Sequence, residues 1–245
     1  MYSTLKNIAK TILPKKFLLQ NERFFRRLIA KRYAGDSMQC NICEYNLKQF
    51  VERSNGDLLC PNCGSLSRTR RLYNTLTTLP LKGKVLHFSP PQNLSSKLKA
   101  IDSIHYVTTD FVGEFATDFH YDITSISADD NAFDIIICYH VLEHIEEDTK
   151  AMSELYRVLK PNGICFIQTP FKDGDIYEDY SITTEEGRLA AFGQEDHVRI
   201  YSVDALNKRL QVAGFSTNLI TANSDSFYGF RNETYIKAIK PKFSD

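Results

Sequence analysis

The sequence predicts an α/β protein in which a parallel sheet covered by helices follows a small cysteine-bearing module. From Lys84 onward, apolar runs of strand length alternate with helical segments, the rhythm of parallel strands joined by helical crossovers. Ahead of this region, four of the six cysteines form two Cys-x2-Cys pairs. A chain of 245 residues can bury one full α/β core and still carry a small module.

We expect three regions: a basic amphipathic helical arm over 1–35, the cysteine module with a linking helix over 36–80, and the α/β domain over 81–245. The arm should form two helical pieces divided at Pro14, and its only acid before Tyr33 is Glu22, although the whole chain has a formal net charge of zero. We favour an arm that packs on the protein's own surface. The alternative is peripheral membrane contact, with an interfacial helix on anionic lipid.

The strands and helices of the α/β domain follow from apolar runs and stop signals. The expected strands are Lys84–Phe88, His105–Thr109, Asp134–Tyr139, Gly163–Gln168, Ser216–Thr221 and Glu233–Ile239, with a weaker one near Phe115–His120. The expected helices are Arg68–Leu79, Glu147–Leu159 and Val203–Ala213, the last two ended by glycine. The polar segment Phe171–Tyr201 interrupts the pattern, as lids and binding loops do.

The cysteine module has the spacing of a zinc ribbon. Its ligands would be Cys40, Cys43, Cys60 and Cys63, with sixteen residues between the two pairs. Four thiolates suit tetrahedral zinc and leave no open position, so the site would be structural and would contribute on the order of 10 kcal/mol to folding. Paired disulfides, free thiols and an iron–sulfur cluster are the alternatives.

The remaining cysteines and the overall hydropathy indicate a cytoplasmic protein. Cys138 and Cys165 stand alone in apolar runs, where a thiol serves as a small hydrophobic side chain. Clustered metal-type cysteines fit a reducing compartment better than disulfides do. The chain has no apolar stretch of about 18 residues, and its N-terminus lacks the pattern of a signal peptide.

The centre of the predicted α/β domain resembles a known protein family. The string NAFDIIICYHVLEH, followed by LYRVLKPNG, resembles the central strand and next helix of class I S-adenosylmethionine-dependent methyltransferases. The likeness runs from about Lys84 to Ile239, and the ribbon together with FGQEDHVRIYS looks like a bacterial, type 11-like subgroup. The resemblance implies a Rossmann-like sheet with helices on both faces and S-adenosylmethionine as cofactor.

The candidate cofactor residues lie where strands end, because ligands of open parallel sheets bind beyond the carboxyl ends of the strands. Asp110 follows the second strand, where its carboxylate could accept hydrogen bonds from both ribose hydroxyls; a turn or helix-cap carboxylate is the alternative. The resemblance places Asp122 and Ile123 near the adenine, and Tyr139 and His140 beside the methionine portion.

The loop after the first strand departs from the family pattern. A glycine-rich turn normally lets backbone and a helix N-terminus approach the cofactor, but here His87, Phe88, Ser89 and Pro90 lead into the loop, and none of its residues is glycine. Proline fixes φ and removes an amide donor. We therefore expect this loop to hold the cofactor through Ser89, side chains or fewer amides.

The candidate general bases are histidines, which suit proton removal near neutral pH. We name His197, in the polar excursion, and His144, after the fourth strand, with His140 as a further candidate. The alternatives are a structural hydrogen bond for His197 and a turn cap for His144.

The sequence thus predicts a methyltransferase acting on a small-molecule or glycan acceptor, the glycan part resting on resemblance alone. One alternative is an RNA methyltransferase that grips nucleic acid with its ribbon and with Arg68, Arg70 and Arg71, a cluster for which a solvated helix face is the simpler explanation. The other is a non-catalytic binding module whose first loop no longer holds cofactor.

Overall fold

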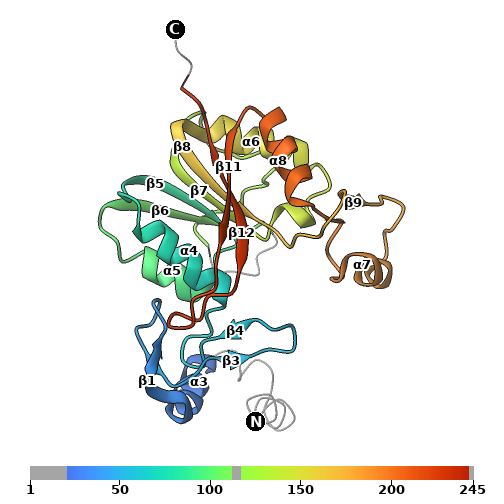
Figure 1. Cartoon of the computed structure of the whole chain (residues 1–245). Helices are drawn as coiled ribbons and strands as arrows, with labels where there is room; N and C mark the ends of the chain where they lie inside the picture. Colours follow the sequence, from blue (N-terminus) through green and yellow to red (C-terminus); the bar gives the residue numbers. More distant parts are fainter. Residues whose placement is uncertain (1–20, 112–116, 243–245) are drawn as a thin grey trace. The chain divides into compact units, whose positions relative to one another are not determined.

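The computed structural model describes residues 21–111 and 117–242 (Figure 1). The chain divides into two compact units. The first runs to Pro80 and also takes in Pro91–Leu98 and Asn223–Glu233, and the second comprises Leu81–Pro90, Lys99–Ala222 and the chain from Thr234 onward. Two short segments of the α/β region therefore belong to the same unit as the cysteine module.

The second unit is built on a six-stranded sheet in the order β11-β12-β8-β7-β5-β6. The strands are β5 (Gly83–Phe88), β6 (Ile104–Thr109), β7 (Phe133–Tyr139), β8 (Leu159–Gln168), β11 (Ser216–Ala222) and β12 (Glu233–Ile239). Strands β6, β5, β7 and β8 are parallel, whereas β12 is antiparallel to β8. All six principal predicted strands are confirmed, and the predicted α/β class with them.

The weaker strand near Phe115–His120 is reduced to one bridge. Phe119 pairs in parallel with Thr109, and no longer strand forms among the described residues of that stretch, which begin at Thr117. Backbone bonds from Asp118 and Phe119 to the Thr108 carbonyl still hold the segment beside the end of β6.

Helices α6 (Asp148–Val158) and α8 (Val203–Val212) flank the sheet and confirm the predicted helices to within a residue at each end. On α6, Ala151, Met152, Leu155 and Val158 are fully buried at helical spacing, because this face packs on the core. The Ser202 side chain caps α8, and Gly214, with φ near +105°, ends it as a left-handed residue.

The polar excursion after β8 forms its own small elements: β9 (Tyr177–Glu178), α7 (Glu185–Phe192) and β10 (Arg199–Ile200), with β9 antiparallel to β10. Outside the excursion, a 3-10 turn, η2 (Leu142–His144), lies between β7 and α6. Figure 1 shows β9 and α7 carried on a long loop away from the sheet. The carbonyl of Tyr201 accepts a hydrogen bond from the Lys172 amide, which closes the excursion at its base.

The first unit contains α3 (Glu22–Ala30), η1 (Lys31–Tyr33), α4 (Ser67–Thr77) and α5 (Gln92–Leu98). Two antiparallel pairs carry the cysteine module: β1 (Ala34–Gln39) with β2 (Asn46–Leu47), and β3 (Val51–Glu52) with β4 (Leu58–Leu59). Helix α3 confirms the described part of the second predicted helical piece of the arm; the rest of that piece and the whole of the first lie outside the described residues. Within the described chain, no helix is long and apolar enough to cross a membrane.

The arginine cluster after the last cysteine is mostly buried, which corrects the expectation of a solvated face. Arg70 is fully enclosed: it donates hydrogen bonds to the carbonyls of Ser65, Tyr228 and Gly229 at 2.6, 2.8 and 2.7 Å, and its guanidinium lies 4.1 Å from the centre of the Phe50 ring. The neighbouring Arg71 is also buried and donates to the carbonyls of residues 223 and 231. These two cations therefore hold the first unit together.

Candidate functional site

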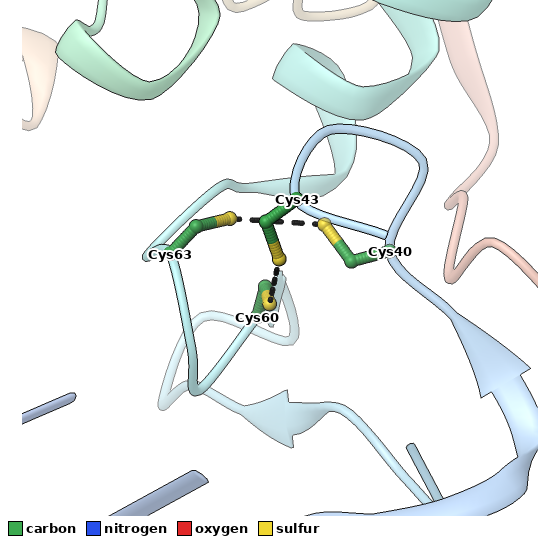
Figure 2. Close-up of side chains that lie close together, drawn as sticks. All are labelled: Cys40, Cys43, Cys60 and Cys63. Carbon is green, nitrogen blue, oxygen red and sulfur yellow. Dashed lines mark hydrogen bonds between the residues drawn. The ribbon is translucent and has the colours of Figure 1, made fainter. Parts of the chain in front are cut away.

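The four cysteines of the first unit converge on one point (Figure 2). The Sγ atoms of Cys40 and Cys63 are 3.7 Å apart, those of Cys43 and Cys60 are 3.8 Å apart, and all four lie within 4.8 Å of one another. A tetrahedral ion with metal–sulfur bonds of about 2.3 Å requires sulfur–sulfur edges of about 3.8 Å. The cluster thus has the dimensions of a zinc-ribbon site, as predicted.

Both Cys-x2-Cys pairs are shaped by the same backbone turn. The residue after each pair, Glu44 or Gly64, has a positive φ and donates its amide to the carbonyl of the first cysteine, at 2.7 and 2.9 Å. The two turns hold the four sulfur atoms close together without an ion, and a preformed set of four thiols is suited to a divalent cation.

The second unit brings the strand-end residues to one edge of its sheet. Strands β5, β6, β7 and β8 are parallel, and the pairs β5–β6 and β7–β8 stay in register up to their last residues, so Ser89 and Asp110 follow directly on the first pair and His140 on the second. The Ser89 hydroxyl donates to Oδ1 of Asp110 at 2.7 Å, and the Asp110 side chain is buried. The residues predicted to open the cofactor site are therefore in contact with one another.

The glycine-free loop still makes a turn of the kind that glycine normally supplies. Ser89 has φ of 45° and His140 has φ of 55°, both in the left-handed region that costs an ordinary residue energy. Two adjacent strands thus end in strained residues at the same edge. Strain of this type concentrates at binding and catalytic sites, where the surrounding structure maintains it.

His87 and Phe88 lie inside the sheet rather than at its edge. The His87 ring is buried and its Nδ1 lies 2.8 Å from the Tyr106 hydroxyl, and burial lowers the pKa of His87 to about 3. Phe88 belongs to the hydrophobic core, and Pro90 is buried as well. Of these four loop-entry residues, Ser89 contacts Asp110 through its side chain.

The segment carrying Asp122 and Ile123 is tied to the end of β6, since the Tyr121 amide donates to the Thr109 hydroxyl at 2.8 Å. Oδ1 of Asp122 accepts hydrogen bonds from the amide and hydroxyl of Thr124, so part of this carboxylate stabilises a turn. Ile123 is buried in the core cluster. Asp122 thus lies on a turn beside the end of β6, next to the buried Ile123.

Beyond β7, the three candidate histidines meet two acids. His140 Nδ1 is 3.1 Å from Oε1 of Glu143, and His144 Nδ1 is 3.1 Å from Oδ2 of Asp196. The rings of His144 and His197 are in edge-to-face contact, with centroids 4.7 Å apart. Burial, and next the neighbouring His144, lower the pKa of His197, so this imidazole is neutral near neutral pH.

Sequence reasoning had missed the two acids of this group, Glu143 and Asp196. The signal was present, because His140, Glu143 and His144 fall on one turn and Asp196 precedes His197. By contrast, Cys138 and Cys165 are fully buried, and burial raises both pKa values, as expected of structural thiols. The exposed rings of Tyr177 and Tyr180 lie on the excursion.

Comparisons with known proteins agree with this geometry. A family model described as "Methyltransferase domain" matches residues 71–219. A demethylmenaquinone methyltransferase of Clavibacter sepedonicus is 31% identical over 117 residues, 41% of this chain and 48% of that protein. A probable S-adenosylmethionine-dependent methyltransferase of Mycolicibacterium smegmatis is 27% identical over 96 residues, covering 39% and 34%. The chain spans less than half the length of either relative.

Solved structures show the same fold at low identity. The 1,6-didemethyltoxoflavin-N1-methyltransferase of Burkholderia thailandensis, solved with S-adenosylhomocysteine, superposes with a TM-score of 0.51 at 13% identity, covering 71% of this chain and 78% of that one. The YcgJ protein of Bacillus subtilis gives 0.50 at 13% identity, covering 70% and 98%. The family match spans more than half of the chain, and its sheet carries the candidate cofactor residues at the expected edge. The chain therefore belongs to the class I S-adenosylmethionine-dependent methyltransferases.

Proposed function

We propose that this methyltransferase modifies a small-molecule or glycan acceptor and that the cysteine cluster holds a structural zinc ion. The observation that carries the acceptor class is the burial of Arg70 and Arg71, because a ribbon that grips RNA needs its cations at the surface. The zero net charge of the chain points the same way. The relative from Clavibacter is named for a small-molecule acceptor, demethylmenaquinone.

Binding of the cofactor would fall to the edge residues. Asp110 fits the ribose hydroxyls, because its buried carboxyl group already accepts a hydrogen bond from Ser89 and its two oxygens can accept from two neighbouring hydroxyl groups. Asp122 would face the adenine, with Ile123 behind it, and Tyr139 and His140 would flank the methionine portion. S-adenosylmethionine supplies the electrophilic methyl group, so the protein's task is alignment, exclusion of water and removal of a proton.

The proton acceptor would come from the histidine group beyond β7. His197 is buried at 3% exposure and neutral, and His144 is oriented by Asp196. A neutral imidazole within reach of the acceptor can remove the proton from a hydroxyl or an amine as the new bond to carbon forms. We propose His144 and His197 for this role, with the excursion limiting the entry of water.

Zinc on Cys40, Cys43, Cys60 and Cys63 would be structural, since four thiolates fill its coordination sphere. The strands around the site are only two residues long on three of the four segments, too short to be stable by themselves. Metal ligation would supply the stability that this module's small core lacks.

The acceptor class is tested by following the transferred methyl group. Purified protein and S-adenosylmethionine labelled in the methyl group are incubated with a cell extract divided into a small-molecule and glycan fraction and an RNA fraction. We expect label in the first fraction, and clearly less of it with Asp110→Asn when the cofactor is kept below saturation. Label confined to RNA would overturn the acceptor proposal and favour an RNA methyltransferase. No transfer to either fraction would count against both.

A further inference from the structure

A second cluster of potential metal ligands lies in the other unit of the chain. Glu143, His144 and His197 each offer one ligand atom, and these atoms all lie within 4.8 Å of one another. Glu143 is 1% exposed and His197 is 3% exposed. One carboxylate and two imidazoles form a ligand set that holds divalent transition metals in many proteins.

The cluster also contains polar atoms that the protein does not satisfy. Among the described residues, Glu143 Oε2, His197 Nε2 and His140 Nε2 are buried and have no hydrogen-bond partner. Buried polar groups nearly always have one, so each exception requires an explanation. A carboxylate oxygen and an imidazole nitrogen both present lone pairs, and a cation held between them would satisfy them together.

The outer atoms of the same side chains are held in place. His140 Nδ1 contacts Oε1 of Glu143, and Asp196 Oδ2 contacts Nδ1 of His144, both at 3.1 Å. The backbone of Phe192 is hydrogen-bonded to the ring of His197, whose Nε2 is left without a partner. One side of each residue is therefore fixed while the other is available, the usual arrangement around a bound metal.

The backbone beneath the cluster is rigid without any ion. Arg199, fully buried, donates hydrogen bonds to the carbonyls of Leu142, Ile145 and Glu146, which belong to the turn that carries Glu143 and His144. The Val198 amide donates to the Glu143 carbonyl at 2.9 Å. The excursion residue His197 and the η2 turn are thus locked together, so the three ligand positions are preset.

We propose that Glu143, His144 and His197 bind a divalent transition-metal ion and leave coordination positions open for an oxygen donor. Sites with three protein ligands are of the open type that takes water or substrate. With an ion bound, His144 and His197 would act as ligands and not as proton acceptors, and a hydroxyl oxygen bound to the ion would lose its proton more readily to water. This last point rests on the proposed function and narrows the acceptor to one that carries a hydroxyl group beside the cofactor edge.

The metal is tested by its binding to the full, untagged chain, with no acceptor or cofactor present. Zinc-replete protein is dialysed against Co2+, and both metals are quantified per chain by mass spectrometry. We expect one cobalt beyond the zinc of the cysteine site, with a visible spectrum of nitrogen and oxygen ligation. Glu143→Gln, nearly equal in shape, and His197→Gln should each weaken this binding about 10- to 100-fold.

The matched control is His105→Gln, because His105 is an exposed histidine on β6 far along the chain from the cluster. It should bind cobalt as the wild type does, and circular dichroism should show that all three variants are folded. The proposal would be overturned if the wild type kept a single zinc ion per chain and took up no cobalt. Equal cobalt binding by the wild type and Glu143→Gln would overturn it as well. Since no methyl transfer is measured, failure of the acceptor proposal would leave this result unaffected.

Discussion

Acidification is expected to destabilise the six-stranded sheet through His87. This imidazole is 1% exposed on β5, and burial lowers its pKa to about 3, whereas in the unfolded chain it titrates near 6.5. Below pH 6.5, His87 is therefore protonated in the unfolded chain but stays neutral in the folded protein. The stability associated with neutral His87 is present above that pH and is lost as the pH falls towards 3.

The size of the effect follows from the shift. Each pH unit between the two pKa values changes the free energy of unfolding by about 1.4 kcal/mol, so lowering the pH from 6.5 to 5 costs about 2 kcal/mol. The hydrogen-bond partner of this ring is the Tyr106 hydroxyl, which cannot compensate a charge. We therefore expect His87 to make the free energy of unfolding fall as the pH is lowered below 6.5.

Urea unfolding measured from pH 7.5 to 5 tests this reasoning. His87→Gln loses packing at every pH but cannot titrate, so the stability difference between wild type and variant should shrink by about 2 kcal/mol over the range. The control His105→Gln should keep the wild-type slope, because His105 is exposed. Parallel curves for wild type and His87→Gln would refute a neutral, buried His87.

Three further predictions concern other buried groups. Burial raises the pKa of Glu233 to about 7 although Arg71 lies 3.4 Å away, so the stabilising contribution of protonated Glu233 is lost as the pH rises through 7. In urea unfolding, Glu233→Gln should be more stable than wild type by about 1–3 kcal/mol at pH 8 and equal to it at pH 4. A less stable variant at pH 8 would contradict this. Cys60→Ser should lose zinc and the circular dichroism of the first unit, and an unchanged zinc content would exclude thiolate ligation. Arg199→Lys should cost about 3 kcal/mol, against under about 1 for the more exposed Arg188→Lys, and equal costs would show that the buried ion pairs with Glu178 are unimportant.

The parts of the fold that could be predicted from the sequence are those determined by residues close together in the chain. The run Ile135–Cys138 is continuously apolar because a central parallel strand is buried on both faces, and α8 ends where Gly214 supplies a left-handed residue. The two Cys-x2-Cys pairs likewise carry their spacing in the chain itself. In each case the residues that decide the structure are neighbours in sequence.

The features that escaped prediction depend on residues far apart. Arg70 and Arg71 look like a solvated basic cluster until residues 223–233 supply the carbonyls that bury them. The positive φ of Ser89 has no sequence signal, since serine normally avoids that region. Glu143 received no role from the sequence, because the cluster forms only where the chain returns with His197.

For the candidate cofactor residues, the structure shows where each side chain lies, and their roles in binding stay predictions. Asp110 and Ser89 meet as a site requires, but His87 and Ile123 contribute to the core. A pattern shows which residues follow a strand, whereas the direction of each side chain depends on pleat and packing.

Calorimetry on the full, zinc-replete chain can establish whether the carboxyl edge of the sheet binds S-adenosylmethionine despite its glycine-free loop. We expect saturable binding of S-adenosylmethionine and of S-adenosylhomocysteine by the wild type. Asp110→Asn should weaken both about 10-fold or more, because a charge-assisted pair of hydrogen bonds contributes about 1.5–3 kcal/mol. No heat of binding at millimolar cofactor, from a folded sample, would contradict the account.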